Sequence, residues 1–278
     1  MNSFVRLRIV KSGIHTILIR QNRMGLQKYG VPPGGPMDIE MANQANWLVG
    51  NKEDSPLLEI TLQGPVIEFS GNCQIAITGA TAPVSVNSTS IEQNKTTSIN
   101  NGDVLTIGKT TNGSRAYLAV RGEWPLSDSE NTLQNYVFKK EDELFIKPGS
   151  RPLKQRTLPI IDYSDIDNFI IKSIPGPEWD ELPDRARKAI TSTTFMVLPE
   201  SNRMGYRLSP SLPNIDKSII SSGIVPGVLQ VTPEGLPILL MQDGPTTGGY
   251  VRALTVLAAD LPKLGQLRPG DQFRFLMQ

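Results

Sequence analysis

Residues 226–241 read PGVLQVTPEGLPILLM and contain two short apolar runs, Val228–Val231 and Ile238–Met241, separated by a segment with Pro and Gly. Such runs, bounded by turn-forming residues, are typical of β-strands. The same pattern recurs along the whole chain, where 24 Gly and 22 Pro residues punctuate it. This close spacing is typical of β-sandwiches and β-barrels, so a mainly β fold is expected. The other predicted strands are Val5–Val10, Val66–Phe69, Gln74–Thr78, Val104–Ile107, Ala116–Val120, Phe169–Ile174, Phe195–Leu198 and Phe273–Phe275.

Two short helices are expected between the strands. Asp38 can cap the N-terminus of the first, which carries Met41 and Ala45 on its apolar face and has its stop at Gly50. The second covers Pro183–Ile190, with Pro in the first turn, where its missing N–H costs nothing.

Composition limits the classes of function. The 278 residues suggest about two domains at roughly 150 residues each. The 28 Lys and Arg nearly balance the 27 Asp and Glu, so nothing points to nucleic acid or an anionic membrane as a partner. The first eight residues hold no long apolar stretch, and no apolar run approaches the roughly 18 residues of a membrane span. A soluble, cytoplasmic protein is expected.

The chain has one cysteine, Cys73, and one histidine, His15. A single cysteine excludes an internal disulfide and a Cys-cluster zinc site, and a single histidine excludes paired-His metal motifs. Both residues lie in β-type runs, where packing roles are favoured. No metal site is expected, so the chemistry must depend on carboxylates, hydroxyls, arginines and backbone amides.

Three short patterns occur twice, in the same order along the chain. Their collinear recurrence predicts a duplicated β domain, with boundaries at residues 1–155 and 156–278. The seam is expected near Lys147–Pro152, a basic stretch with Pro and Gly. The patterns are Asn22–Gly25 with Asn202–Gly205, Thr61-x-x-Gly64-x-x-Ile67 with Thr232-x-x-Gly235-x-x-Ile238, and Gly102-Asp103 with Gly270-Asp271.

The sharpest candidate site is the segment Gln242–Tyr250, which directly follows an apolar strand. Asp243 could act as a base or hold a substrate N–H, and the glycine amides could bind a developing oxyanion. The alternative is a plain β-turn, because Asp-Gly-Pro and Gly-Gly are common turn residues. The segment is not a nucleotide-binding P-loop, since Gly244 and Gly248 enclose three residues and no Lys follows.

Arg23 and Arg203 each precede Met-Gly in the two copies of one repeated pattern. An arginine beside a glycine bend can bind a carboxylate with two nitrogens of its guanidinium group. A structural salt bridge is the simpler interpretation. We predict that both arginines face one interdomain cleft with Asp243 at its wall, since a close pair of guanidinium groups needs anions between them. Asp38 is a further candidate at a helix start that could bind an anion, but its capping role is favoured.

Longer motifs extend over nearly the whole sequence. They resemble the biotin-dependent carboxyltransferase family, also called the allophanate hydrolase subunit 2-like family, and within it the C subunit of 5-oxoprolinase. The stretch Pro226–Tyr250, closing with Asp260–Asp271, is the strongest and most specific part of the resemblance. The motifs are Asn22–Asp38, Ala45–Asn51, Leu58–Pro65, Ala76–Ala80, Ser201–Leu208, Pro226–Tyr250 and Asp260–Asp271.

The resemblance implies two related cyclophilin-like β-barrel domains from an internal duplication, with a cleft between them. It also implies one component of a multi-subunit enzyme that hydrolyses the lactam of 5-oxoproline to glutamate. Partner proteins resembling the A and B subunits of 5-oxoprolinase would handle ATP, so this chain would bind no cofactor. The catalytic candidates are then Asp243, Thr246, Thr247 and Tyr250, and the substrate-binding candidates are Arg23, Arg203, Asp38, Gln230, Gly248 and Gly249.

Two other functions stay open. One is biotin-dependent carboxyl transfer to urea or a related amide, which needs a separate carrier because this sequence contains no Met-Lys-Met attachment motif. The other is a non-catalytic module that binds and antagonises a kinase-inhibitor protein. The sequence departs from the family at Asn22 and Asn202, where an acidic residue or glycine is usual, and at the short acidic segment Gly122–Thr132, so one wall of the cleft is expected to differ.

Overall fold

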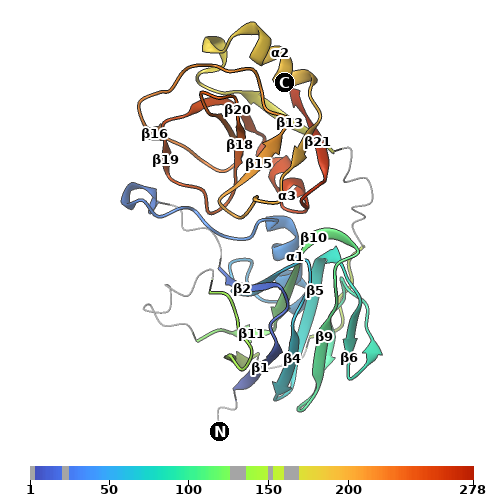
Figure 1. Cartoon of the computed structure of the whole chain (residues 1–278). Helices are drawn as coiled ribbons and strands as arrows, with labels where there is room; N and C mark the ends of the chain where they lie inside the picture. Colours follow the sequence, from blue (N-terminus) through green and yellow to red (C-terminus); the bar gives the residue numbers. More distant parts are fainter. Residues whose placement is uncertain (1–3, 21–24, 126–135, 150–152, 160–168) are drawn as a thin grey trace. The chain divides into compact units, whose positions relative to one another are not determined.

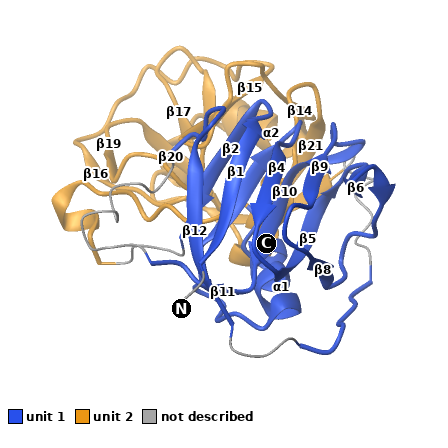
Figure 2. Ribbon diagram, turned by 90° about the horizontal axis from the view of Figure 1, so that it is seen from below, with its two compact units in different colours: residues 1–21, 38–163 blue, residues 22–37, 164–278 orange. Residues whose placement is uncertain are grey.

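The structure is a computed structural model that describes residues 4–20, 25–125, 136–149, 153–159 and 169–278 (Figure 1). The chain forms two compact units (Figure 2). Unit 1 comprises residues 1–21 and 38–163, and unit 2 comprises residues 22–37 and 164–278. The chain therefore leaves unit 1 early, contributes one segment to unit 2, and returns to complete unit 1.

This division differs in two ways from the boundary expected between residues 155 and 156. Residues just after that point are tied to unit 1, because the Arg156 N–H donates to Thr96 Oγ1 at 3.2 Å and the Leu158 N–H donates to the Asn94 carbonyl at 2.8 Å. The segment 22–37 also belongs to unit 2. The sequence of this segment, with its Pro and Gly residues, does not indicate which unit the segment packs against.

Unit 1 consists of two antiparallel sheets. The larger has seven strands and the smaller has five. In order, the larger sheet contains β11 (Gly122–Glu123), β12 (Glu143–Pro148), β1 (Val5–Lys11), β4 (Val66–Ser70), β9 (Val104–Ile107), β6 (Val84–Val86) and β7 (Thr89–Ser90). In order, the smaller contains β2 (His15–Ile19), β3 (Leu57–Thr61), β10 (Asn112–Val120), β5 (Cys73–Thr81) and β8 (Thr97–Ile99).

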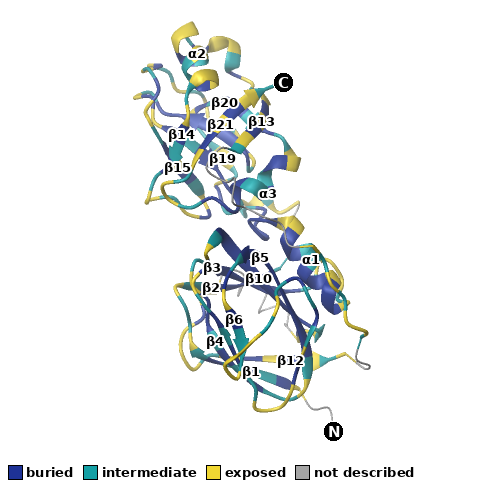
Figure 3. Ribbon diagram, turned by 90° about the vertical axis from the view of Figure 1, so that its right-hand side faces the viewer, coloured by how far each residue is buried: buried dark blue, intermediate teal, exposed yellow. Residues whose placement is uncertain are grey.

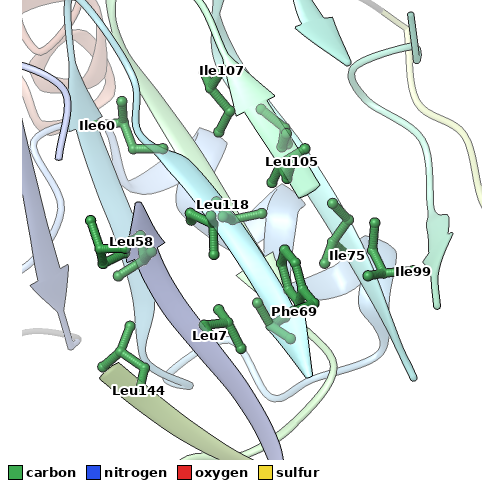
Figure 4. Close-up of a cluster of buried hydrophobic side chains, with 14 of the residues drawn as sticks. Leu7, Leu58, Ile60, Phe69, Ile75, Ile99, Leu105, Ile107, Leu118 and Leu144 are labelled. Atoms are coloured by element: carbon green, nitrogen blue, oxygen red, sulfur yellow. The ribbon is translucent and has the colours of Figure 1, made fainter. Parts of the chain in front are cut away.

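Both sheets contribute side chains to a shared hydrophobic core cluster in unit 1 (Figure 4). Strand β1 alternates buried and half-buried residues, as expected for a strand with one face on a core. Leu7 and Phe69 come from the larger sheet, and Leu58 and Leu118 come from the smaller one. Cys73 packs at the edge of this core, which agrees with the packing role expected for it.

Helix α1 (Ile39–Val49) packs on β5 and β10 of the smaller sheet. Asp38 Oδ1 accepts the Met41 N–H at 3.1 Å, and Gly50 ends the helix in the left-handed region at φ 67°. The predicted cap and stop of this helix are thus confirmed. The second predicted helix is α2 (Asp184–Ser192), and Pro183 stands at its N-cap rather than in its first turn.

The strands of unit 2 form a closed seven-stranded barrel, which confirms the mainly β prediction. Strand β21 closes it by pairing in parallel with β13. Around the barrel the order is β13 (Phe169–Pro175), β20 (Val251–Val256), β17 (Val228–Val231), β18 (Pro237–Leu240), β15 (Gly205–Ser209), β14 (Phe195–Val197) and β21 (Gln272–Met277).

Smaller elements surround this barrel. Two short strands, β16 (Ser222–Gly223) and β19 (Thr247–Gly248), pair with each other in a separate ribbon. Helix α2 packs on β21 and buries only Ala186 and Ile190, so most of its surface is exposed (Figure 3). A third helix, α3 (Leu261–Leu264), was not predicted. Among the described residues, the 3-10 turns are η1 (Gln27–Tyr29), η4 (Trp179–Glu181) and η5 (Ala258–Asp260).

One of the repeated patterns folds alike in both units. Gly102 and Gly270 both have positive φ, and the next residue, Asp103 or Asp271, accepts the N–H of the residue three positions earlier at 2.7 Å. Both turns lead into a strand, β9 or β21. The glycines that end another repeated pattern, Gly25 and Gly205, differ in the elements that follow them. Gly205 begins β15, whereas Gly25 precedes a 3-10 turn, and both segments belong to unit 2.

Within the described ranges, no helix combines the length and the apolar character needed to cross a membrane.

Candidate functional site

The segment Gln242–Tyr250 follows strand β18, as predicted, and its first residues are fixed against the turn before β15. The Asp243 N–H donates to the Arg203 carbonyl at 2.9 Å, and the Met241 N–H donates to the Met204 carbonyl at 3.1 Å. The Gly244 N–H donates to the Met241 carbonyl at 2.9 Å, which closes a tight turn around Asp243. Two segments that lie far apart in sequence are therefore held together by their backbones.

The side chains of Arg203 and Asp243 form a bidentate ion pair at this point. Arg203 Nε lies 2.7 Å from Asp243 Oδ2, and Arg203 Nη2 lies 3.1 Å from Asp243 Oδ1. The two side chains are only 10% and 14% exposed. Fork-shaped contacts of this kind fix both position and orientation of a carboxylate. The salt bridge considered for Arg203 in the sequence is present, and its partner is the candidate catalytic carboxylate.

The segment that unit 2 takes from near the N-terminus completes this arrangement. Arg203 Nη2 donates to the Gly35 carbonyl at 2.7 Å, and the Gly34 N–H donates to the Gln242 carbonyl at 3.0 Å. Gly34 and Gly35 have φ of 64° and 87°, a region that favours glycine. The two glycines thus let the chain double back against Arg203, which explains why this stretch reads Pro-Pro-Gly-Gly-Pro.

The remaining candidates of the loop lie in or beside the ribbon of β16 and β19. Thr246 is half-buried and its carbonyl accepts the Ile224 N–H at 3.1 Å. Thr247 and Tyr250 are exposed, and the Gly249 carbonyl accepts the Ile219 N–H at 2.9 Å. The loop therefore divides into a largely buried start that carries Asp243 and a more exposed end that carries the hydroxyl groups.

Gln230 lies on β17 and is 4% exposed. Its Nε2 is buried and has no hydrogen-bond partner among the residues that the structure describes. A Cβ placed on Gly248 would lie 2.6 Å from this Nε2, so the glycine allows the ribbon to approach the amide closely. The structure thus brings two predicted binding residues, Gln230 and Gly248, into direct contact.

A second ion pair, which the sequence did not indicate, lies beside Gln230. Arg252 on β20 is the register partner of Gln230 and makes a bidentate contact with Glu178, with Nε to Oε2 at 2.9 Å. The Arg252 guanidinium holds the pKa of the Glu178 carboxyl below its usual value. Arg252 Nη1 also donates to the Gly223 carbonyl at 3.1 Å, which anchors the ribbon. No short-range motif joins positions 178 and 252, so this pair could not be seen in the sequence.

Asp38 belongs to unit 1, whereas the loop with Asp243 belongs to unit 2. Asp38 is 1% exposed, its carboxylate caps α1, and its N–H donates to Tyr117 Oη at 2.8 Å. This is the capping role that the sequence favoured, and a binding role for Asp38 stays a prediction. Arg23 lies outside the described residues, so the shared cleft of Arg23 and Arg203 also stays a prediction. Among the described residues, no three His, Cys, Asp or Glu side chains group as a candidate metal centre.

Comparison with known proteins assigns the family. The family described as carboxyltransferase domain, subdomain A and B, matches residues 29–277. The chain belongs to this family. Membership agrees with the resemblance found in the sequence, and the match includes the whole loop with Asp243.

Among members of the carboxyltransferase domain family, two kinds of protein are similar. The 5-oxoprolinase C subunit of Escherichia coli (strain K12) is 30% identical over 280 residues, covering 97% of this chain and 90% of the relative. Urea amidolyase of Lachancea kluyveri is 34% identical, covering 91% of this chain but only 16% of that much longer protein. The crystal structure of the K. lactis urea amidolyase superimposes with a TM-score of 0.90 at 28% identity, covering 98% of this chain and 18% of that one.

Proposed function

We propose that this protein is one component of an ATP-dependent 5-oxoprolinase, which hydrolyses the lactam of 5-oxoproline to glutamate. The observation that carries the proposal is the 30% identity to a 5-oxoprolinase C subunit over 97% of this chain. This chain covers 90% of the Escherichia coli 5-oxoprolinase C subunit, whereas it covers only 16% of a urea amidolyase of similar identity. The similarity to the bacterial subunit therefore extends over nearly all of both sequences.

The loop after β18 supports an amide as the substrate. Asp243 would act as a base on the substrate, and Arg203 would orient the Asp243 carboxylate through the bidentate contact. Because two Arg203 nitrogens are already occupied by Asp243 and Gly35, we propose an orienting role for Arg203 in place of direct contact with the substrate carboxylate. Thr246, Thr247 and Tyr250 would supply hydroxyl groups at the exposed end of the loop.

ATP use falls to partner proteins in this proposal. The sequence has no P-loop motif, and the name of the similar bacterial protein marks it as one of several subunits. Both observations support partners that resemble the A and B subunits of 5-oxoprolinase. We also place the assembly in the cytoplasm and expect this chain to bind no cofactor of its own.

Reconstitution tests the proposal. The full chain is coexpressed with 5-oxoprolinase partners of the A-like and B-like types, and ATP-dependent release of glutamate from 5-oxoproline is measured. We expect turnover only when all three proteins are present. Turnover that does not depend on this chain, or none at all from the assembled complex, would contradict the proposal.

A second candidate function is carboxyl transfer from carboxybiotin to urea, and it is supported by the similarity to urea amidolyases. A separate biotin carrier would bring the carboxyl group as a substrate. The distinguishing assay supplies carboxylated biotin carrier and urea to the full chain. Loss of the carboxyl group from biotin only when urea is present would favour this second function over the first.

A further inference from the structure

Two buried polar atoms without partners among the described residues lie beneath the ribbon of β16 and β19 in unit 2. One is Gln230 Nε2 on β17, and the other is Ser222 Oγ on β16. A buried polar group that forms no hydrogen bond is unfavourable, because it has given up its contacts with water without replacement. Native proteins hold few such groups, so two at one place need an explanation.

The pairing of the ribbon shows that both groups face the same space. Ser222 lies directly opposite Gly248 in the antiparallel pair, and side chains of directly opposed residues lie on the same face. A Cβ on Gly248 would point to within 2.6 Å of Gln230 Nε2. The Ser222 side chain is therefore also on the face that covers Gln230.

Apart from the Arg252–Glu178 ion pair beside Gln230, apolar side chains lie around the two groups. Val228 is two residues from Gln230 on the same face of β17, and it clusters with Ile224 and Leu240, against which Ile238 packs. A ligand at this place would meet a few polar atoms within a hydrophobic setting, which is the usual composition of a small-molecule site.

We propose that Gln230 and Ser222 bind the cis-amide edge of the substrate, the side on which a lactam or a urea presents N–H and C=O next to each other. The Gln side-chain amide also carries a donor and an acceptor side by side, so the two groups can form a pair of antiparallel hydrogen bonds. Ser222 Oγ donates a third bond to the ligand carbonyl. The methylene groups of a lactam ring then pack on Val228, Ile224 and Leu240.

The ribbon acts as the cover of this site. Within the described part of the chain, its strands pair with each other and with no strand of the barrel, and Arg252 links it to the barrel through the Gly223 carbonyl. In the structure the ribbon lies over this site, and Gly248 occupies the space next to the Gln230 amide. The ligand reaches the amide when the ribbon moves outward, and its N–H and C=O then supply the partners of Gln230 and Ser222.

This inference rests on the proposed function for its substrate class, but it is tested on the full chain without partners or ATP. 2-Pyrrolidinone, the lactam ring of 5-oxoproline without the carboxylate, is titrated while the Gln230 side-chain NH₂ signal is followed by ¹H–¹⁵N NMR. We expect a saturable shift of that signal. N-methyl-2-pyrrolidinone and γ-butyrolactone lack the N–H, so each should bind about tenfold more weakly or worse. Urea is titrated in a parallel arm at concentrations too low to unfold the chain, and the tighter ligand identifies the substrate type.

Variants separate binding from folding. Gln230→Met has a similar size and removes the unpartnered amide, so it should abolish lactam binding while the thermal midpoint of unfolding stays equal or rises. Ser222→Ala should weaken binding about tenfold, and Gly248→Ala should weaken it by displacing the Gln230 amide. Gln272→Met on the exposed side of β21 is the matched control and should change nothing.

Three results would overturn the inference: no shift of the Gln230 signal, equal binding of the three ring compounds, or a marked drop in the thermal midpoint of Gln230→Met. If lactam binding fails while the reconstituted complex hydrolyses 5-oxoproline, this inference falls and the proposed function stands. If 2-pyrrolidinone binds at Gln230 while the complex is inactive on 5-oxoproline, the proposed function is wrong and the amide-binding site at Gln230 and Ser222 is supported.

Discussion

At the scale of single residues, the pair Arg203–Asp243 links stability to the candidate site. Its side chains are almost buried, and removing one partner of such a pair leaves the other charge without compensation. We expect Arg203→Met to lower the free energy of unfolding by about 3–5 kcal/mol, and the double variant Arg203→Met/Asp243→Leu to recover much of the loss. Denaturation by guanidinium chloride measures both.

The exposed pair of Lys147 and Glu123 provides the control for this experiment. Their side chains are 55% and 83% exposed, so the charges are screened by water and Lys147→Met should change stability little. Equal effects of Arg203→Met and Lys147→Met would show that burial of the Arg203 pair does not matter.

Glu178 makes the free energy of unfolding depend on pH. The Arg252 guanidinium lowers the pKa of the Glu178 carboxyl in the folded chain, so the pair stabilises the fold above the unfolded pKa of a glutamate, about 4.3. This contribution is lost as pH falls through the lower, folded pKa. We expect the unfolding free energy to decrease from about pH 5 to pH 3, and Glu178→Gln to flatten that decrease. The exposed Glu200→Gln should leave the profile unchanged, and identical profiles for all three chains would contradict this expectation.

Cys73 should be unreactive while the chain is folded. Burial, followed by the nearby Asp103 charge, raises the pKa of its thiol to about 12. Because the thiolate is the reactive form, iodoacetamide should modify folded chain far more slowly at pH 8 than unfolded chain. Mass spectrometry after timed quenching measures the two rates. Similar rates in the two states would show that the thiol is accessible and ionises normally.

At the scale of elements, the turn between β17 and β18 depends on Gly235. This residue has φ of 83°, and a Cβ there would lie 2.0 Å from the Leu212 carbonyl oxygen. Gly270 has φ of 97° but open space around its Cα. Gly270→Ala should therefore cost about 1–2 kcal/mol from backbone strain alone, and Gly235→Ala distinctly more. Chemical denaturation of the two variants compares them, and equal losses would argue against the close contact with Leu212.

Sequence patterns predicted elements best where alternation was long and turns were clear. The runs Val104–Ile107 and Val228–Val231 coincide with β9 and β17. Strand β15 was missed because it reads GYRLS, in which only Tyr206 and Leu208 point inward between turn-like residues. The order of the strands in the sheets could not be predicted from the sequence, because β1 pairs with β12, more than 130 residues later in the chain.

The candidate site was predicted only in part, for a similar reason. The loop with Asp243 is a continuous motif and could be recognised, and Arg203 was selected from a repeated pattern. The contact between them, and the place of Ser222, Glu178 and Arg252 near Gln230, depend on strands that meet only in the folded barrel. The local sequence around such residues does not indicate which other residues they will contact.

At the scale of the whole molecule, the chain path explains why one site draws on distant segments. Residues 22–37 leave unit 1 and place the Gly35 carbonyl on Arg203 in unit 2. Family membership over residues 29–277 covers both the described end of this segment and the loop that it supports. The proposed function therefore depends on the full chain, and a fragment that begins after residue 37 should lack part of the site.

The most direct test of the account is the activity of the reconstituted complex with Asp243→Asn. ATP-dependent glutamate release from 5-oxoproline should fall by about 10²-fold or more, because a positioned acid–base group is lost while the size of the side chain is kept. Asp180→Asn, which alters a carboxylate that is 95% exposed, should retain full activity. Wild-type rates from the Asp243→Asn complex would contradict the central claim that this loop acts on the lactam.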